Sequence, residues 1–247
     1  MSLIYAHRGA SGYAPENTME AFTLAAQQGA DGIELDVRRS RDGELVVVHD
    51  ERVERVWDGF GRVRDLTLSQ LRRMRPDRAL PPYVNARVPT LEEVLTFARE
   101  KNLLVNLEIK GDEADDEDVE ERCLALSARC GMEKSVLYSS FDTGRMLRVR
   151  QIDPTARCAL LCTWFARSPA HSARDLGMNA LHPPYRPLRM KAVCARARAL
   201  GLAVNVWGVN RPRALSRCFL AGVDGVITNY PDQALTIRNI IDGKNGR

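Results

Sequence analysis

Short apolar runs alternate with amphipathic stretches along most of the chain. The apolar runs have the length and β-branched content of buried strands, and several end abruptly in polar residues. They predict strands at residues 3–7, 32–37, 103–110, 135–140, 155–162, 180–182, 202–207 and 225–228. Between them, apolar positions recur at helical spacing, commonly after a capping residue and before a glycine. The pattern is therefore one strand followed by one helix, repeated along the chain.

Two of the predicted helices begin with a capping sequence. Asn17 is followed three residues later by Glu20, and Thr90 is followed in the same way by Glu93. We expect Asn17 to be the N-cap of the first helix, which should end at Gly29 because glycine commonly closes a helix.

Eight strand–helix units in about 250 residues predict a (β/α)8 TIM barrel, a fold of the α/β class. A doubly wound open sheet is the alternative, but such a sheet commonly has a glycine-rich first turn. Here the first turn carries His7-Arg8-Gly9 instead. Because no linker rich in Pro, Gly or Ser divides the chain, we expect a single domain over residues 1–247.

Residues 51–89 interrupt the alternation. They follow an additional short strand predicted at 45–48 and contain little regular pattern. A stretch of this length is typical of a lid, an insertion or disorder. Because Trp57 and Phe60 bring large apolar surface, an ordered insertion is favoured.

Arginine dominates the positive charge of the chain. The formal net charge is +4 and the pI is near 8.8, and only five of the 36 basic residues are lysines. This mild charge suits an anionic small-molecule substrate and is weak support for nucleic acid. No apolar run approaches the roughly 20 residues of a membrane span, and the first residues lack a signal-peptide pattern. We therefore expect a cytoplasmic protein without stable membrane insertion; its oligomeric state stays open.

Six cysteines are scattered along the chain without a C-x-x-C motif. Most of them lie within apolar helical or strand patterns. They are interpreted as small core residues of a protein in a reducing compartment, and not as a metal site.

The first predicted strand ends in a histidine, an arginine and a glycine. Gly9 lets the backbone turn sharply just after His7 and Arg8. Arginine offers a planar fork of donors to phosphate oxygens, and histidine moves protons near neutral pH. In a barrel enzyme, side chains at the carboxyl ends of strands form the catalytic site. The stretch indicates a phosphate site, although on its own it fits an ordinary surface loop equally well.

Two carboxylates lie two residues apart in the second predicted strand. Alternation places Glu34 and Asp36 on the same face of this strand. If that face is the barrel interior, the two charges repel each other unless a cation compensates them. Oxygen ligands of this kind suit Mg²⁺ or Ca²⁺. The alternative is that both face outward, while Ile33, Leu35 and Val37 fill the barrel.

The third predicted strand repeats this spacing at its end with Glu108 and Lys110. An inward carboxylate on a second strand would supply a third oxygen ligand. Lys110 would then lie one step nearer the mouth of the barrel, where its ammonium can meet a phosphate. A structural Glu–Lys pair is the alternative.

His49 follows the short strand at 45–48, as His7 ends the first strand. Two histidines at neighbouring strand ends would make an acid–base pair. The alternative for His49 is a buried structural histidine.

Two bulky residues lie at the ends of later strands. We expect His182 to have a structural or pocket-wall role. Trp207 either caps the barrel core or forms a wall of the substrate pocket.

Taken together and in order, these motifs resemble the glycerophosphodiester phosphodiesterase family. The matching fragments are His7-Arg8-Gly9, Pro15-Glu16-Asn17-Thr18, Glu34-x-Asp36, Asp42-Gly43, His49-Asp50, Glu108-Ile109-Lys110, Val206-Trp207 and Asp224-Gly225-Val226-Ile227-Thr228. The resemblance implies a (β/α)8 barrel with a small insertion after the second histidine. It also implies a divalent metal ion at Glu34, Asp36 and Glu108, with acid–base roles for His7 and His49.

The resemblance further implies phosphate contacts from Arg8 and Lys110, a supporting role for Glu16, and packing of Trp207 against glycerol. The chain departs from the family at 55–58, where Arg-Val-Trp-Asp replaces the common Arg-Thr-Thr. This difference concerns contacts of the insertion and the preference for the alcohol.

We therefore predict a metal-dependent hydrolase that converts glycerophosphodiesters to sn-glycerol 3-phosphate and an alcohol such as choline or ethanolamine. The attacking group is either water or the glycerol 2-hydroxyl, through a cyclic phosphate. The first alternative is a phospholipase D or lysophospholipase D, which an apolar membrane-binding loop would favour. The second is a non-catalytic barrel that binds glycerophosphoryl groups, which would require loss of a histidine or a metal ligand.

Overall fold

Eight parallel strands close into a barrel in the computed structural model, which describes residues 1–77, 82–110, 118–163, 168–186 and 189–245. The barrel strands are β1 (Leu3–His7), β2 (Gly32–Arg39), β4 (Leu104–Ile109), β5 (Val136–Ser140), β6 (Arg157–Leu161), β7 (Ala180–His182), β8 (Ala203–Trp207) and β9 (Gly225–Thr228). Strand β1 pairs with both β9 and β2, which closes the barrel. The predicted TIM barrel is confirmed.

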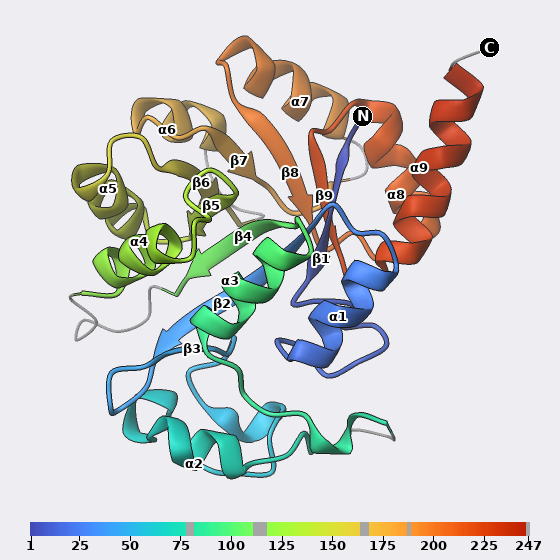
Figure 1. Ribbon diagram of the computed structural model, residues 1–247. Helices are drawn as coiled ribbons and strands as arrows, with labels where there is room; N and C mark the ends of the chain where they lie inside the picture. The colour runs from blue at the N-terminus through green and yellow to red at the C-terminus, as the bar shows by residue number, and fades with distance from the viewer. Residues whose placement is uncertain (78–81, 111–117, 164–167, 187–188, 246–247) are drawn as a thin grey trace.

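Helices surround the barrel and connect its strands (Figure 1). They are α1 (Met19–Gln27), α3 (Leu91–Glu100), α4 (Val119–Arg129), α5 (Thr143–Ile152), α6 (Pro169–Asp175), α7 (Met190–Ala199), α8 (Pro212–Ala221) and α9 (Pro231–Asn245). Each barrel strand is followed by at least one helix, as the sequence pattern predicts.

The start of α1 differs from the prediction. Thr18, and not Asn17, is the N-cap: its Oγ1 accepts a hydrogen bond from the Ala21 N–H at 3.2 Å. Asn17 lies one residue earlier in a left-handed conformation with φ of 56°, which asparagine tolerates better than most residues. The capping box of Thr90 and Glu93 is confirmed.

The main core lies between the barrel and its helices. Ile33, Leu35 and Val37 of β2 are buried there together with Phe22 of α1 and Leu95 of α3. Because side chains alternate along a strand, the other face of β2 points into the barrel. Near the amino ends of their strands, a small apolar cluster is formed by Leu137, Ala159 and Ala180, with Ala203 packed against it.

A short strand, β3 (Leu45–Val47), pairs antiparallel with β2 and leads into the insertion. Strand β4 pairs along one edge of β2, so β1 and β3 both lie along its other edge, β1 beside Gly32–Glu34 and β3 beside Val37–Arg39, and they do not pair with each other. The strands at whose ends His7 and His49 lie therefore do not pair with each other, as the sequence suggested, but follow one another along the same edge of β2. His49 lies two residues beyond the end of β3.

The insertion is ordered around a small core of its own. It contains η1 (Val53–Arg55), η2 (Val63–Asp65), α2 (Leu68–Arg73) and η3 (Tyr83–Asn85), and Figure 1 shows α2 below β3. Trp57 is 2% exposed within this core, which also includes Val46 and Val48 from the β3 region. Phe60 is 78% exposed and packs under the guanidinium of Arg52 at 4.8 Å. Residues 78–81 of the insertion lie outside the described part.

All six cysteines are buried and unpaired. Within the described ranges, no helix has the length and apolar character needed to cross a membrane.

Candidate active site

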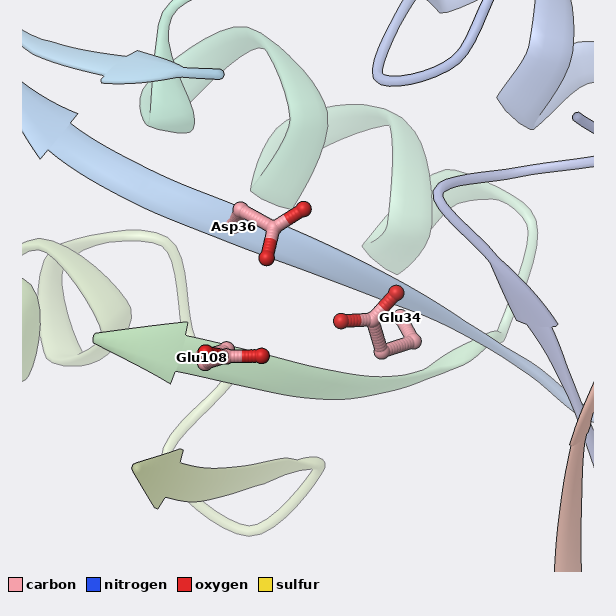
Figure 2. A group of neighbouring side chains, drawn as sticks. All are labelled: Glu34, Asp36 and Glu108. Carbon is pink, nitrogen blue, oxygen red and sulfur yellow. The ribbon is translucent and has the colours of Figure 1, made fainter. Parts of the chain in front are cut away.

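Three carboxylates meet inside the barrel. Glu34 and Asp36 come from β2 and Glu108 from β4, and the register pairs Asp36 with Glu108. Figure 2 shows the three side chains facing one another across the two strands. One oxygen of each lies within 4.8 Å of the others, and all three residues are buried. The alternative in which Glu34 and Asp36 face outward is therefore excluded by the structure.

Two cationic side chains lie against this cluster. Lys110 Nζ is 2.6 Å from both Asp36 Oδ1 and Glu108 Oε1. Arg8 Nε is 3.3 Å from Asp36 Oδ2, on the opposite carboxylate oxygen. Asp36 thus lies between an ammonium and a guanidinium.

The three carboxyl groups have different pKa values because their surroundings differ. Burial and the neighbouring Asp36 raise the pKa of Glu34 well above its ordinary value. Burial is also the main cause that raises the pKa of Glu108, to about 7. For Asp36, the positive charges of Lys110 and Arg8 outweigh burial and lower the pKa. Full ionisation of all three groups requires more positive charge than the two side chains supply.

This donor set fits a divalent cation. Three carboxylates present hard oxygen ligands close together, which is the coordination that Mg²⁺ and Ca²⁺ prefer. A bound cation would also compensate the repulsion that raises the pKa of Glu34 and Glu108.

A tight turn after β1 places Arg8 in the site. Arg8 adopts a left-handed conformation with φ of 55°, and its backbone N–H donates to Glu34 Oε2 at 2.9 Å. Gly9 follows with φ of 80°, and a Cβ atom there would lie 2.6 Å from the backbone of Ala21. Glycine is therefore required at this position by both conformation and space. The Arg8 Nη1 then donates to Glu16 Oε1 at 2.9 Å.

His7 is oriented by a residue from the other end of the chain. Its Nδ1 lies 2.7 Å from Asn229 Oδ1, and its Nε2 lies 3.9 Å from Glu34 Oε2. Burial and the positive charge of Arg8 lower the pKa of His7 to about 4. His7 is thus neutral at neutral pH.

His49 follows β3, which lies on the same edge of β2 as the strand that ends in His7. Its Nδ1 lies 2.6 Å from Asp50 Oδ1, and its carbonyl accepts a hydrogen bond from Arg38 Nε at 3.0 Å. Burial and the positive charges of Lys110 and Arg8 lower the pKa of His49, although the charge of Asp36 and the hydrogen bond to Asp50 act in the opposite direction.

An open cleft of about 540 Å³ reaches Glu108 of this cluster and the neighbouring Lys110. It is lined by Arg38, His49, Asp50, Glu51, Glu108, Lys110, Ser140, Phe141 and Asp142. Phe141 meets Trp207 edge to face, with ring centroids 6.2 Å apart and an interplanar angle of 83°. The Trp207 Nε1 donates to the carbonyl of His182 at 3.1 Å. Trp207 is therefore half-buried behind an aromatic wall of the cleft.

The comparison with known proteins settles the family. The sequence profile of the Glycerophosphoryl diester phosphodiesterase family matches residues 7–233. The chain belongs to this family.

Phosphodiesterases of several bacteria are similar over their whole length. The chain is 35% identical over 239 residues to a glycerophosphodiester phosphodiesterase of Caldanaerobacter subterraneus subsp. tengcongensis, covering 96% of this chain and 97% of the relative. It is 32% identical over 241 residues to one of Bacillus altitudinis, covering 96% and 98%. As a member of the phosphodiesterase family, the chain is a hydrolase.

Solved structures of the family have the same fold. A glycerophosphodiester phosphodiesterase of Agrobacterium tumefaciens superposes with a TM-score of 0.83 at 30% identity, covering 96% of this chain and all of that one. A phosphodiesterase of Oleispira antarctica, in complex with the product sn-glycerol-3-phosphate, superposes with a TM-score of 0.85 at 26% identity, covering 98% and 97%.

Sequence reasoning does not identify three residues of the candidate site. Asn17 Nδ2 donates to Asp36 Oδ2 at 2.8 Å, Asn229 holds His7, and Arg55 bonds to both Glu16 and Asp50. The sequence around Asn17 predicts a helix cap, because Asn17 lies three residues before Glu20, and this pattern carries no sign of the hydrogen bond to Asp36.

His182 lies inside the barrel of this phosphodiesterase. It is fully buried, its Nε2 lies 3.0 Å from Asn205 Nδ2, and burial lowers its pKa to about 3. A fully buried side chain does not form a pocket wall, so the structure favours the structural role for His182.

Proposed function

We propose that this chain hydrolyses glycerophosphodiesters to sn-glycerol 3-phosphate and an alcohol, in a divalent-metal-dependent reaction. The observation that carries the proposal is the buried cluster of Glu34, Asp36 and Glu108 beside Arg8 and Lys110. The product complex of the similar Oleispira antarctica enzyme supports the same product here.

In this proposal, Glu34, Asp36 and Glu108 hold a Mg²⁺ or Ca²⁺ ion. Such an ion supplies Lewis-acid polarisation of a phosphate oxygen. Asp36 and Glu108 pair in register on β2 and β4, and Glu108 lines the open cleft, so these residues would hold the ion within reach of a substrate there.

Arg8 and Lys110 bind the phosphate group and stabilise the negative charge that develops on its oxygens. The bond from Arg8 to Glu16 keeps the guanidinium in place, and Glu16 stays ionised because hydrogen bonds from Arg55 and Arg8 outweigh burial and lower its pKa. Lys110 lines the cleft directly.

The two histidines move the protons. His7 is neutral near neutral pH, so its Nε2 accepts the proton of the attacking hydroxyl, with Nδ1 held by Asn229. The attacker is water or the glycerol 2-hydroxyl. His49 donates a proton from Nε2 to the departing alcohol oxygen, with Nδ1 held by Asp50.

Trp207 and Phe141 form one wall of the substrate pocket, and a pocket of this kind supports a small-molecule substrate. The insertion at about 51–89 belongs to the same catalytic domain, which we place over residues 1–247. A cytoplasmic location stays a prediction, carried by six buried free thiols that are typical of a reducing compartment.

The decisive experiment measures release of glycerol 3-phosphate from glycerophosphocholine by the full chain. EDTA should abolish turnover and added Mg²⁺ or Ca²⁺ should restore it. Glu108→Gln should weaken metal binding in calorimetry while leaving the fold intact, because it removes charge but little volume. Full activity after exhaustive chelation would refute the metal-dependent reaction.

Lysophosphatidylcholine in the same assay separates the alternatives. A phospholipase D-type enzyme would prefer this lipid to glycerophosphocholine. A non-catalytic barrel would bind glycerophosphocholine but release no product from either compound.

A further inference from the structure

Arg55, the last residue of η1, extends from the insertion to two carboxylates of the candidate active site. Its Nη1 and Nη2 donate to Glu16 Oε2 and Oε1 at 2.9 and 2.7 Å, and its Nε donates to Asp50 Oδ2. A bidentate guanidinium–carboxylate pair fixes geometry as well as charge. Arg55 therefore holds Glu16 and Asp50 in a set arrangement.

Each of these carboxylates contacts a residue to which the proposed function assigns a role. Asp50 Oδ1 lies 2.6 Å from His49 Nδ1, and Glu16 Oε1 accepts a hydrogen bond from Arg8 Nη1 at 2.9 Å. The contacts form a continuous path from His49 through Asp50, Arg55 and Glu16 to Arg8. One guanidinium thus lies between the proton donor and the phosphate-binding arginine.

The charge state of this path fixes the tautomer of His49. Burial alone would raise the pKa of Asp50, but the hydrogen bonds from Arg55 and His49 outweigh it and lower the pKa. An ionised carboxylate accepts hydrogen bonds and donates none. His49 Nδ1 must therefore carry a hydrogen, and Nε2 is the nitrogen left for the substrate.

The backbone under Arg55 is anchored independently of its side chain. The Val53 N–H donates to the Gly61 carbonyl at 3.1 Å, and the Trp57 N–H donates to the Val53 carbonyl at 2.9 Å. Val53 and Trp57 are both buried in the insertion core, whereas the Arg55 side chain is 50% exposed. A substitution of Arg55 should therefore change the contacts with Glu16 and Asp50 without emptying the insertion core.

We propose that Arg55 is a positioning residue that makes the insertion part of the catalytic apparatus: it orients His49 through Asp50 and Arg8 through Glu16. This inference rests on the proposed function, since His49 and Arg8 take their roles from it.

The test compares Arg55→Met with Arg52→Met in the full chain. Arg52 lies in the same turn and carries the same charge, but its Nη2 pairs within the insertion with Glu54 at 2.6 Å. We expect Arg55→Met to lower kcat on glycerophosphocholine by about 10–100-fold, the scale of losing a partner that orients an active-site histidine, with a smaller change in KM. Arg52→Met should keep the wild-type kcat.

The second readout is the ¹⁵N spectrum of the histidine side chains, which needs no turnover. The chain has only four histidines, so their ring nitrogens can be assigned individually. Wild-type and Arg52→Met protein should show the His49 tautomer with hydrogen on Nδ1 at a pH above neutrality, and Arg55→Met should show a mixture of the two tautomers. A wild-type protein that released no product would refute the proposed function, while the tautomer comparison would still test the action of Arg55 on His49.

Arg55→Lys is the second variant, to be used if Arg55→Met does not fold. Lysine keeps the charge but cannot span both carboxylates with a planar fork, so we expect the same change of tautomer and a smaller loss of kcat. Wild-type kcat together with wild-type His49 shifts in a folded Arg55 variant would overturn the proposal. A loss of kcat that follows thermal stability alone, with the His49 tautomer unchanged, would also overturn it, because Arg55 would then be only structural.

Discussion

The ammonium of Lys110 lies 2.6 Å from Asp36 Oδ1, and the two side chains are 9% and 1% exposed. This ion pair lies within the cluster of Glu34, Asp36 and Glu108, and the Lys110 ammonium is also 2.6 Å from Glu108 Oε1. A positive charge from the chain thus partly neutralises the cluster. On the proposed function, Lys110 stabilises the metal-free protein and competes with the cation for these carboxylates.

We therefore expect Lys110→Met to lower the stability of chelator-treated protein by about 3–5 kcal/mol, the cost of breaking a buried ion pair. In a chain of this size each kcal/mol lowers Tm by roughly 2–4 °C. Calorimetry should show tighter binding of Mg²⁺ or Ca²⁺, because a competing charge has gone. The control is Lys134→Met, an exposed lysine. Unchanged metal affinity in Lys110→Met would contradict the competition.

The pH dependence of kcat/KM should be bell-shaped, because one histidine must be neutral and the other protonated. Burial and Arg8 lower the pKa of His7 to about 4, so the ascending limb should lie below the ordinary histidine range. As pH rises through this limb, His7 loses its proton and activity appears. His7→Ala should remove this limb, and His49→Ala should remove the descending one.

Either histidine variant should lose about 10²–10⁴ in kcat. A nitrophenyl phosphodiester has a good leaving group and needs little protonation of the departing oxygen. His49→Ala should recover much of its rate on this substrate, and His7→Ala should not. Equal defects on both substrates would show that the two histidines do not divide the work in this way.

Trp207→Ala should raise KM for glycerophosphocholine by about tenfold, the scale of losing one large aromatic contact. Phe141→Ala should have a similar effect, because the two rings pack edge to face. The double variant should then lose less than the sum of the two free-energy changes. Phe60→Ala, which removes an aromatic ring that is 78% exposed, is the control. An unchanged KM in Trp207→Ala would place this residue outside the substrate pocket.

His182 makes the fold sensitive to acid. Its pKa is lowered from 6.5 to about 3 by burial, so the unfolded chain binds a proton first as pH falls. Its contribution is therefore constant above pH 6.5 and is lost between pH 6.5 and about 3, at about 1.4 kcal/mol for each pH unit. Urea unfolding of His182→Asn should show a smaller loss of stability over this range. His171→Asn, at an exposed position of α6, serves as the control; if it matched His182→Asn, burial of His182 would not be the cause.

The barrel was predictable because its strands are short, apolar and separated by capped helices. Eight of them end in or near polar residues, and the alternation of Glu34 and Asp36 with Ile33, Leu35 and Val37 is visible in the sequence. What alternation does not reveal is which face turns inward. That choice became clear only from the contact of Glu34 and Asp36 with a carboxylate on β4.

The supporting contacts of the site were not predictable for a different reason. His7 and Asn229 are 222 residues apart, and Arg55 meets Glu16 across 39 residues. Such pairs depend on barrel closure and on the path of the insertion, and neither leaves a periodic signal. The left-handed conformation of Asn17 likewise depends on the turn that presents its amide to Asp36.

The closure of the barrel between β1 and β9 also has a consequence for synthesis of the protein. A ribosome makes the strands that carry Glu34, Asp36 and Glu108 before half of the chain has been translated, together with His7 and Arg8. Strand β1, however, can pair with β9 only after β9 has been synthesised, and the same holds for the hydrogen bond between His7 and Asn229. A nascent chain therefore contains all three carboxylates early, but it holds the imidazole of His7 in place only when translation is nearly finished.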